Sequence, residues 1–234
     1  MSKLKLYLDG AELNQMIDAS KDNNIAGFTT NPTLMKKSGI TDYETFAKEV
    51  IEKIPDKPVS FEVFSDELSE MEREARIINS WGGNTYIKIP VMNTKGESTC
   101  SLINKLSSEG LSLNVTAVFT LSQVQEIFDN ITSASKTIIS IFAGRIADTG
   151  IDPIPLMKSA KKMISSNKNC ELLWASPREA LNIIQAEECG CDIITATNDL
   201  IKKRSLFGKD LNEFSKETVL MFYNDAKSAG YKIT

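Results

Sequence analysis

The chain has 234 residues, of which 41% are hydrophobic and 25% are charged, and its formal net charge is −4. This composition is ordinary for a soluble globular protein, and the charge gives no support for nucleic acid or an anionic membrane as partner. No apolar run approaches the roughly 20 residues that a membrane span needs. The sequence contains no histidine. Histidine-based triads and metal sites are therefore excluded, and acid–base chemistry falls to carboxylates, lysine, tyrosine or an activated water.

The beginning of the chain and its cysteines bear on where the protein works. Met1–Lys5 leads directly into a strand-like segment and lacks the apolar core of a signal peptide, so we expect a cytoplasmic protein. The four cysteines are Cys100, Cys170, Cys189 and Cys191. The Cys189-Gly-Cys191 spacing is neither a redox C-x-x-C motif nor half of a recognisable zinc site. We therefore expect small, buried thiols.

Short strand-like runs alternate with longer amphipathic segments through most of the chain, and turn residues separate them. The predicted strands are Leu4–Asp9, Ile25–Thr29, Val59–Val63, Asn84–Ile89, Leu111–Val115, Thr137–Ile141, Glu171–Ala175 and Asp192–Ala196. The predicted helices between them are Asp42–Lys53, Glu67–Asn79, Ser98–Glu109, Leu121–Asn130, Pro155–Ser165 and Arg178–Glu188.

This alternation, at this length, predicts an α/β fold in the form of a (β/α)₈ TIM barrel instead of an open doubly wound sheet. No G-x-G-x-x-G motif follows the first strand and no Walker-type loop is present, which removes the main support for a nucleotide-binding fold. We expect a single domain over residues 1–234, with the barrel ending at about residue 205 and a helical extension over about 206–234. Within the extension, Leu211–Ala229 predicts one more amphipathic helix. It is expected to be either a lid over the barrel mouth or an arm onto a neighbouring subunit.

Lys88 interrupts an apolar run, Thr85–Met92, that otherwise has the pattern of a buried strand. A buried lysine costs free energy unless it is paired, deprotonated or used covalently. Burial favours the neutral amine, which is a nucleophile toward carbonyl groups. The structural alternative is a lysine whose stem packs against the strand while its amine reaches solvent.

Active sites of (β/α)₈ barrels are built from the C-terminal ends of the strands. The predicted strands carry polar residues at or just beyond seven successive ends, and strand alternation gives Asp9 and Lys88 the parity of Tyr7 and Tyr86, toward the barrel interior. Any one of these residues could instead be a helix cap or a turn residue. Together they predict one functional site. The residues concerned are Asp9, Thr29–Pro32, Glu62, Lys88, Asn114, Thr116, Ser140, Arg145, Ser176 and Arg178.

These motifs resemble the transaldolase family, and within it the short subfamily that also contains fructose-6-phosphate aldolases. The T-T-N-P sequence after the second strand and the K-I-P lysine on the fourth are specific to it in combination. The resemblance extends from the first predicted strand through the eighth. The matching segments are Leu6–Asp9, Gly27–Thr33, Ile87–Pro90, Asn114–Thr116, Phe142–Ile146 and Ala175–Ser176.

The resemblance implies aldol chemistry through a lysine Schiff base. Lys88 then attacks the C2 carbonyl of a ketose phosphate, and the resulting iminium accepts the electrons of the C3–C4 bond. Asp9 corresponds to the residue that takes the proton from the C4 hydroxyl. Glu62 and Thr116 correspond to the pair that holds a catalytic water. Neither a metal nor an organic cofactor is expected.

The resemblance also implies which residues bind the substrate. Asn31 and Asn114 would hydrogen-bond the dihydroxyacetone fragment. The phosphate would bind at two arginines and a serine on adjacent strand ends, an arrangement that suits a dianion on physical grounds as well. The implied binding set is Thr30, Asn31, Asn114, Ser140, Phe142, Arg145, Ser176 and Arg178.

Two positions favour a transaldolase over a fructose-6-phosphate aldolase: Glu62, where the aldolases have glutamine, and Phe142, where they have tyrosine. Without a tyrosine hydroxyl near the catalytic water, the enamine should persist until an aldehyde acceptor arrives. We therefore expect transfer of a dihydroxyacetone unit from sedoheptulose 7-phosphate or fructose 6-phosphate to erythrose 4-phosphate or glyceraldehyde 3-phosphate. This is the transfer of the non-oxidative pentose phosphate pathway.

Three alternatives stay open at this point. The chain could be a lyase that releases free dihydroxyacetone, or a transaldolase-like enzyme of a specialised sugar pathway. It could also be a non-catalytic sensor of sugar phosphates, although a sensor would not need Asp9, Glu62 and Lys88 together. The expected partners are sugar phosphates and further copies of the chain, because short members of the family form homo-oligomers.

Overall fold

The structure, a computed structural model, describes residues 4–233, so residues 1–3 of the Met1–Lys5 segment lie outside it. Eight parallel strands pair in chain order, and β1 pairs with β8 to close the ring. The predicted (β/α)₈ barrel is therefore confirmed. The strands are β1 (Lys5–Asp9), β2 (Ile25–Thr29), β3 (Val59–Glu62), β4 (Thr85–Pro90), β5 (Leu113–Val118), β6 (Thr137–Ile141), β7 (Cys170–Trp174) and β8 (Ile193–Ala196).

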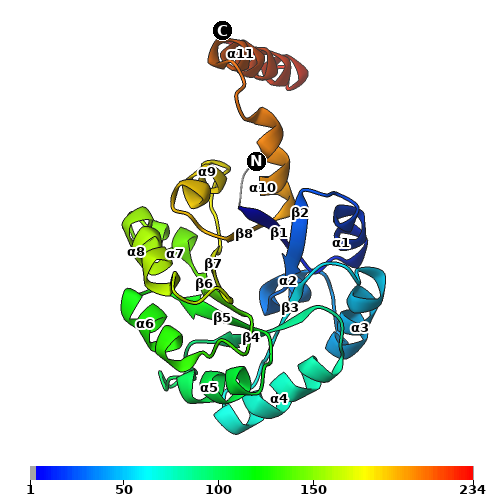
Figure 1. Ribbon diagram of the computed structural model, residues 1–234. Helices are drawn as coiled ribbons and strands as arrows, with labels where there is room; N and C mark the ends of the chain where they lie inside the picture. The colour runs from blue at the N-terminus through cyan, green and yellow to red at the C-terminus, as the bar shows by residue number, and fades with distance from the viewer. Residues whose placement is uncertain (1–3, 234) are drawn as a thin grey trace. The chain divides into compact units, whose positions relative to one another are not determined.

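Helices follow the strands and surround the barrel, as Figure 1 shows. They are α1 (Leu13–Ser20), α2 (Pro32–Lys37), α3 (Tyr43–Lys53), α4 (Leu68–Ser80), α5 (Cys100–Ser108), α6 (Leu121–Asn130), α7 (Ala143–Asp148), α8 (Ile154–Ile164), α9 (Leu181–Glu188) and α10 (Asn198–Lys202). Several begin with a side-chain cap that the sequence provides. The Asp42 carboxylate accepts a hydrogen bond at the start of α3, and Thr120 forms a capping box at the start of α6.

Two apolar layers hold the barrel together. The larger layer lies between strands and helices and contains residues such as Phe28, Ile87 and Trp174, all fully buried. The smaller layer fills the barrel interior and includes Tyr7 and Tyr86. This confirms the predicted parity of these two tyrosines, and it places the side chains two residues further along each strand at the C-terminal end of the interior.

The cysteines belong to the packing of the first layer. Cys100, Cys170, Cys189 and Cys191 are buried and free. Burial raises the pKa of the Cys170 thiol to about 12, so this side chain stays protonated and behaves as a small apolar group. The prediction of small buried thiols is confirmed.

The structure differs from the predicted elements in the connections. The helices α1, α2, α7 and α10 were not predicted. Helices α2, α7 and α10 are too short to show an apolar period, whereas α1 is as long as the predicted helix α9 and its length does not explain the miss. Helix α9 begins at Leu181 and not at Arg178. Its prediction was wrong at this end because Pro177 and the turn that follows it are tied by the Asn182 side chain, which accepts hydrogen bonds from the backbone of Arg178 and Glu179.

The residues from Lys202 onward form a compact unit separate from the unit that ends at Ile201. The C-terminal unit contains a 3₁₀ turn, η1 (Lys203–Leu206), and the helix α11 (Leu211–Ser228), which agrees with the predicted extra helix. Asp210 caps α11, and none of the residues of α11 is buried. Among residues 4–233, no helix combines the length and the apolar composition that crossing a bilayer requires.

Candidate active site

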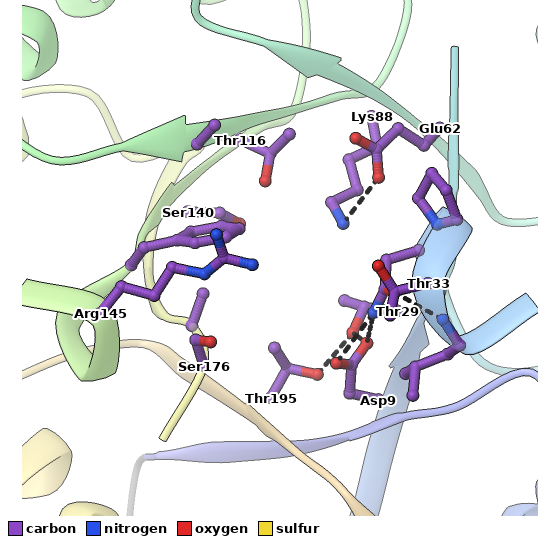
Figure 2. Close-up of a pocket in the computed structure, with 16 residues that line it drawn as sticks. Asp9, Thr29, Thr33, Glu62, Lys88, Thr116, Ser140, Arg145, Ser176 and Thr195 are labelled. Atoms are coloured by element: carbon purple, nitrogen blue, oxygen red, sulfur yellow. Dashed lines mark hydrogen bonds and ion pairs between the residues drawn. The ribbon is translucent and has the colours of Figure 1, made fainter. Parts of the chain in front are cut away.

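A cavity of about 380 Å³ opens at the C-terminal ends of the strands. Nine of the twelve predicted site residues line it, and seven of these are labelled in Figure 2. The three that do not line it are Thr30, Asn114 and Arg178. The nine that do are Asp9, Asn31, Glu62, Lys88, Thr116, Ser140, Phe142, Arg145 and Ser176.

Lys88 lies on β4 with only 8% of its side chain exposed. The parallel register places it beside Glu62 of β3. Its Nζ atom lies 3.0 Å from Glu62 Oε2 and donates a hydrogen bond of 3.0 Å to the backbone carbonyl of Thr30. The amine is therefore buried, ion-paired and at the wall of the cavity. The alternative of an amine in bulk solvent is wrong.

Asp9 ends β1 and accepts hydrogen bonds from two neighbours on the T-T-N-P segment. Thr29 Oγ1 donates to Asp9 Oδ1 at 2.8 Å, and Asn31 Nδ2 donates to Asp9 Oδ2 at 3.2 Å. Burial raises the pKa of the Asp9 carboxyl above its ordinary value, while the positive charge of Lys88 and these hydrogen bonds lower that pKa in part. Asp9 is thus a carboxylate held in one orientation with an increased affinity for a proton.

Asn31 has two structural partners as well as a place on the cavity wall. Its Oδ1 atom accepts a hydrogen bond from the Leu34 N–H and caps α2, and its amide donates to Asp9. Pro32 occupies the first position of α2, where its missing N–H costs nothing. Asn31, for which a turn was the structural alternative, thus caps a helix, and the same residue orients the neighbouring carboxylate.

Thr116 reaches the cavity through an irregularity of β5. The pairing between β5 and β6 shifts register between Val115 and Val118, and Ala117 has a positive φ of 58°. Such a bulge redirects the side chains beside it. Thr116 is 2% exposed, and its Oγ1 atom has no hydrogen-bond partner among the described residues. This hydroxyl is available to a bound molecule.

Asn114 and Thr30 lie beneath the cavity wall. Asn114 accepts a hydrogen bond of 2.6 Å from Ser140 and donates one of 3.0 Å to the Ser60 hydroxyl. Thr30 donates to the Ser60 carbonyl. Both residues are fully buried. The structure therefore places them in the network that supports the wall, with Ser140 as its member at the cavity.

The side of the cavity opposite Lys88 is cationic and aromatic. The Arg145 guanidinium projects from α7 into the opening, as Figure 2 shows, and lies 5.2 Å from the centre of the Phe142 ring. Phe142 in turn packs against Phe119 with 5.7 Å between ring centres. Within residues 4–233, no carboxylate lies within ion-pair distance of Arg145. This positive charge is free to bind an anion.

Arg178 differs from Arg145 because it already has an acidic partner. Its Nε atom donates to Asp148 Oδ1 at 2.8 Å, and this contact lowers the pKa of Asp148 below its ordinary value. Another nitrogen donates to the carbonyl and the hydroxyl of Ser176, at 3.0 and 3.2 Å. Arg178 thus holds Ser176 at the cavity wall from behind.

The sequence profile described as Transaldolase/Fructose-6-phosphate aldolase matches residues 6–233. The chain belongs to this family. The resemblance that the motifs indicated is therefore confirmed, and with it the assignment to an enzyme family that works through a lysine Schiff base.

Several curated relatives carry the name of a transaldolase. Probable transaldolase 2 of Listeria monocytogenes is 34% identical over 218 residues, which cover 92% of this chain and 95% of the relative. Probable transaldolase of Bdellovibrio bacteriovorus is 35% identical over 82% of this chain and 85% of the relative. These relatives support the transaldolase prediction over most of their length, and their names specify no sugar.

Solved structures of low sequence identity show the barrel fold alone. Dihydrodipicolinate synthase from Rhodopseudomonas palustris has a TM-score of 0.60 at 13% identity, covering 95% of this chain and 83% of that chain. A structure described as native KDPGal has a TM-score of 0.55 at 14% identity and covers 86% of this chain and 85% of that chain.

Sequence reasoning missed Thr195, a residue of this transaldolase-family site. Thr195 and Thr29, which was predicted as part of the T-T-N-P segment, both lie at the cavity with buried hydroxyls. Thr195 lies on β8, the one strand for which no polar end was predicted. Its position in the run Ile193–Ala196 was a usable signal, because a hydroxyl in an apolar strand needs a hydrogen-bond partner. The other cavity residues that were not predicted as part of the site are Thr33, Leu34, Ala117 and Ala175.

Gly144 allows α7 to approach the end of β7. A Cβ atom at this position would lie 1.7 Å from the Ser176 carbonyl oxygen, and Ser176 itself has a positive φ of 59°. We expect Gly144→Ala to lower the free energy of unfolding by about 1–3 kcal/mol, since the clash is with backbone that cannot rotate away. Chemical denaturation measures this loss. Ala147→Ser, on the exposed part of the same helix, is the control; an equal stability for both variants would contradict the expectation.

Proposed function

We propose that this transaldolase-family enzyme transfers a dihydroxyacetone unit from a ketose phosphate, sedoheptulose 7-phosphate or fructose 6-phosphate, to an aldose phosphate. The acceptor is erythrose 4-phosphate or glyceraldehyde 3-phosphate. The observation that carries the proposal is the buried Lys88 amine, 3.0 Å from the Glu62 carboxylate at the wall of a cavity whose opposite side carries Arg145. The non-oxidative pentose phosphate pathway and a cytoplasmic location stay predictions from the sequence.

The reaction begins with the attack of Lys88 Nζ on the C2 carbonyl of the donor sugar. The ammonium must first lose a proton, and Glu62 Oε2 lies within hydrogen-bond distance to take it. The carbinolamine then loses its oxygen as water and becomes an iminium. The free Thr116 hydroxyl is the group that, with Glu62, would hold the water that carries these protons.

The C3–C4 bond breaks in the second step. Asp9 takes the proton of the C4 hydroxyl, the C3–C4 electron pair moves into the iminium, and the aldose phosphate leaves with a new aldehyde. The enamine that stays on Lys88 attacks the aldehyde of the acceptor, and Asp9 returns its proton to the new hydroxyl. A carboxylate with an increased proton affinity suits this role, because it must both accept and return one proton.

The phosphate of either sugar binds on the opposite side of the cavity. The Arg145 guanidinium lies there with no ion pair to any carboxylate in the described part of the chain, and Ser176 also lines this side. Arg178 supports Ser176 and keeps Asp148 as its partner, so it would contact the phosphate directly only if a phosphate oxygen competed with that carboxylate. The structure therefore supports Arg145 as the primary phosphate ligand.

A lyase that releases dihydroxyacetone is the alternative that a specific observation tests. Release requires protonation of the enamine. At the cavity, Phe142 stands where the aldolases have tyrosine, and its ring packs against Phe119 and donates no proton. Transfer is therefore favoured over release. A specialised sugar pathway would change the sugars and not these steps.

Borohydride trapping tests the proposal and separates it from its alternatives. With fructose 6-phosphate, borohydride should leave a reduced three-carbon adduct on the peptide that contains Lys88, as peptide mass spectrometry measures. Turnover should require an added aldose phosphate. Steady release of dihydroxyacetone without an acceptor would identify a lyase, and binding of the sugar phosphate without an adduct would identify a sensor.

We also propose that α11 packs against a second copy of the chain, as an arm and not as a lid. Isolated helices of this length are marginally stable in water, and their apolar side chains need a surface to cover them. In α11 the run Val219–Tyr223 is apolar, with each side chain at least half exposed. A neighbouring subunit would bury this run.

The double substitution Val219→Glu and Phe222→Glu should dissociate the oligomer, because it places two charges in the buried part of the interface. Light scattering after size exclusion measures the mass. The matched control is Lys216→Glu, which changes charge on the same helix outside the apolar run and should keep the mass of the unmodified protein. A monomeric unmodified protein would favour the lid.

A further inference from the structure

A chain of hydroxyls connects β8 to the carboxylate of Asp9. Thr29 of β2 and Thr195 of β8 lie on strands that flank β1 on both sides. Their Oγ1 atoms are 2.6 Å apart, and Thr29 Oγ1 lies 2.8 Å from Asp9 Oδ1. Figure 2 shows this chain at one side of the cavity.

We propose that Thr195 is a positioning residue that acts on the Asp9 base through Thr29. The proposal rests on the role of Asp9 in the proposed function, and it adds a residue on the one strand that contributed nothing to the predicted site. Thr195 need not touch the sugar for this role. Its hydroxyl sets the direction of the hydrogen bonds that reach the carboxylate.

The direction follows from the number of protons. A hydroxyl carries one proton, so when Thr29 donates to an ionised Asp9 it can only accept from Thr195. When Asp9 holds the C4 proton on Oδ1, it can donate to Thr29, which then donates to Thr195. The same three groups therefore stay hydrogen-bonded in both states of the base, provided that the residue at position 195 can both donate and accept.

A purely structural role for the Thr195 hydroxyl is less well supported. Thr195 is 5% exposed and Thr29 is 2% exposed, so both hydroxyls are desolvated at a cost. Valine has nearly the same shape and would suit an apolar strand better. Within residues 4–233, the Thr195 hydroxyl forms its side-chain hydrogen bond with the Thr29 hydroxyl. Packing therefore does not explain why position 195 has a hydroxyl, whereas a hydrogen bond that reaches the Asp9 base does.

Other charged groups that face Asp9 would stay unchanged when position 195 is altered. Across the cavity Asp9 faces Lys88, Glu62 and Arg145, and on the outer side of β1 it shares a hollow with Glu12, Lys37 and Asp199. Because none of these is removed by a change at position 195, a shift in the titration of Asp9 would report the hydroxyl chain.

The experiment compares the pH dependence of kcat in the unmodified protein, Thr195→Val and Thr195→Ser. Valine weakens the donor at Thr29, which stabilises the carboxylate less and raises its pKa further. We expect the acidic limb of the profile to move up by about half a pH unit to one unit and kcat above the limb to fall about two- to tenfold. Serine keeps the hydroxyl and should restore both quantities.

The variants Thr29→Val and Thr29→Val with Thr195→Val test whether the effect of Thr195 passes through Thr29. Since Thr195 acts through Thr29, adding Thr195→Val to Thr29→Val should cause little further change. An unmoved acidic limb in Thr195→Val, a limb that stays displaced in Thr195→Ser, or additive effects in the double variant would overturn the proposal. Borohydride trapping with dihydroxyacetone alone needs no C4 proton transfer, so a failure of the unmodified protein to form that adduct would count against the proposed function and not against Thr195 alone.

Discussion

Replacement of Lys88 by methionine should reduce kcat by about 10⁴-fold or more and abolish the borohydride adduct, since no other group at the cavity can form an iminium. Methionine has a similar length and keeps the packing of the buried stem. Glu62 would lose its partner, and its side chain, 16% exposed, can take up water instead. Circular dichroism checks that the variant is folded.

Lys88→Arg separates the nucleophile from the charge. Arginine keeps a positive group beside Glu62, but its guanidinium stays protonated and cannot attack a carbonyl, so we expect the same loss of activity and adduct. Lys95→Met is the matched control, because Lys95 is exposed and pairs with Glu67 on the surface. Retention of activity in both Lys88 variants would place the nucleophile elsewhere.

Replacement of Asp9 by asparagine should reduce the rate of transfer by about 10²- to 10⁴-fold, the usual contribution of a positioned general base. Adduct formation with dihydroxyacetone should persist, because that step does not use the C4 hydroxyl. Rapid-quench measurement of cleavage and mass spectrometry of the adduct separate the two steps. Asp18→Asn, an exposed carboxyl on α1, is the control.

The pH profile provides a further check on Asp9. In the proposed reaction Asp9 acts as a base in its carboxylate form, and burial raises its pKa. Activity should therefore fall as the pH decreases through a value above the ordinary aspartate pKa of about 3.9. In Asp9→Asn the remaining activity should lack this acidic limb. A profile identical in the two proteins would show that another group is responsible for the limb.

Much of the site could be predicted because each residue follows a strand whose pattern is strong. Lys88 stands out in an apolar run, and its register with Glu62 follows from the parallel order of the barrel. Arg145 follows β6 and Ser176 follows β7. Their distances from Lys88 could not be predicted from sequence, but a closed barrel places all these strand ends at the same end of the fold.

The residues that sequence reasoning missed depend on contacts between distant segments. The sequence signal of Thr195, a hydroxyl in an apolar strand, named no partner, and the link to Thr29 appeared only when β8 was placed beside β1. Similarly, the left-handed backbone of Ala117 and Ser176 has no signal in residue type, because neither is glycine. Such conformations persist only when surrounding structure imposes them.

Sequence alone predicted the barrel, because hydrophobic periodicity is a local property of the chain, and its motifs indicated the family by resemblance. That resemblance also implied Lys88 as the Schiff-base lysine, which stays a prediction. The tertiary structure alone decided how the polar residues share their hydrogen bonds. It assigned Arg178 to Asp148, gave Arg145 no acidic partner among residues 4–233, and joined Thr195 to Asp9 through Thr29. The physical reason is that a side chain's partner is set by distance and burial, and both arise only when strands far apart in the sequence lie side by side.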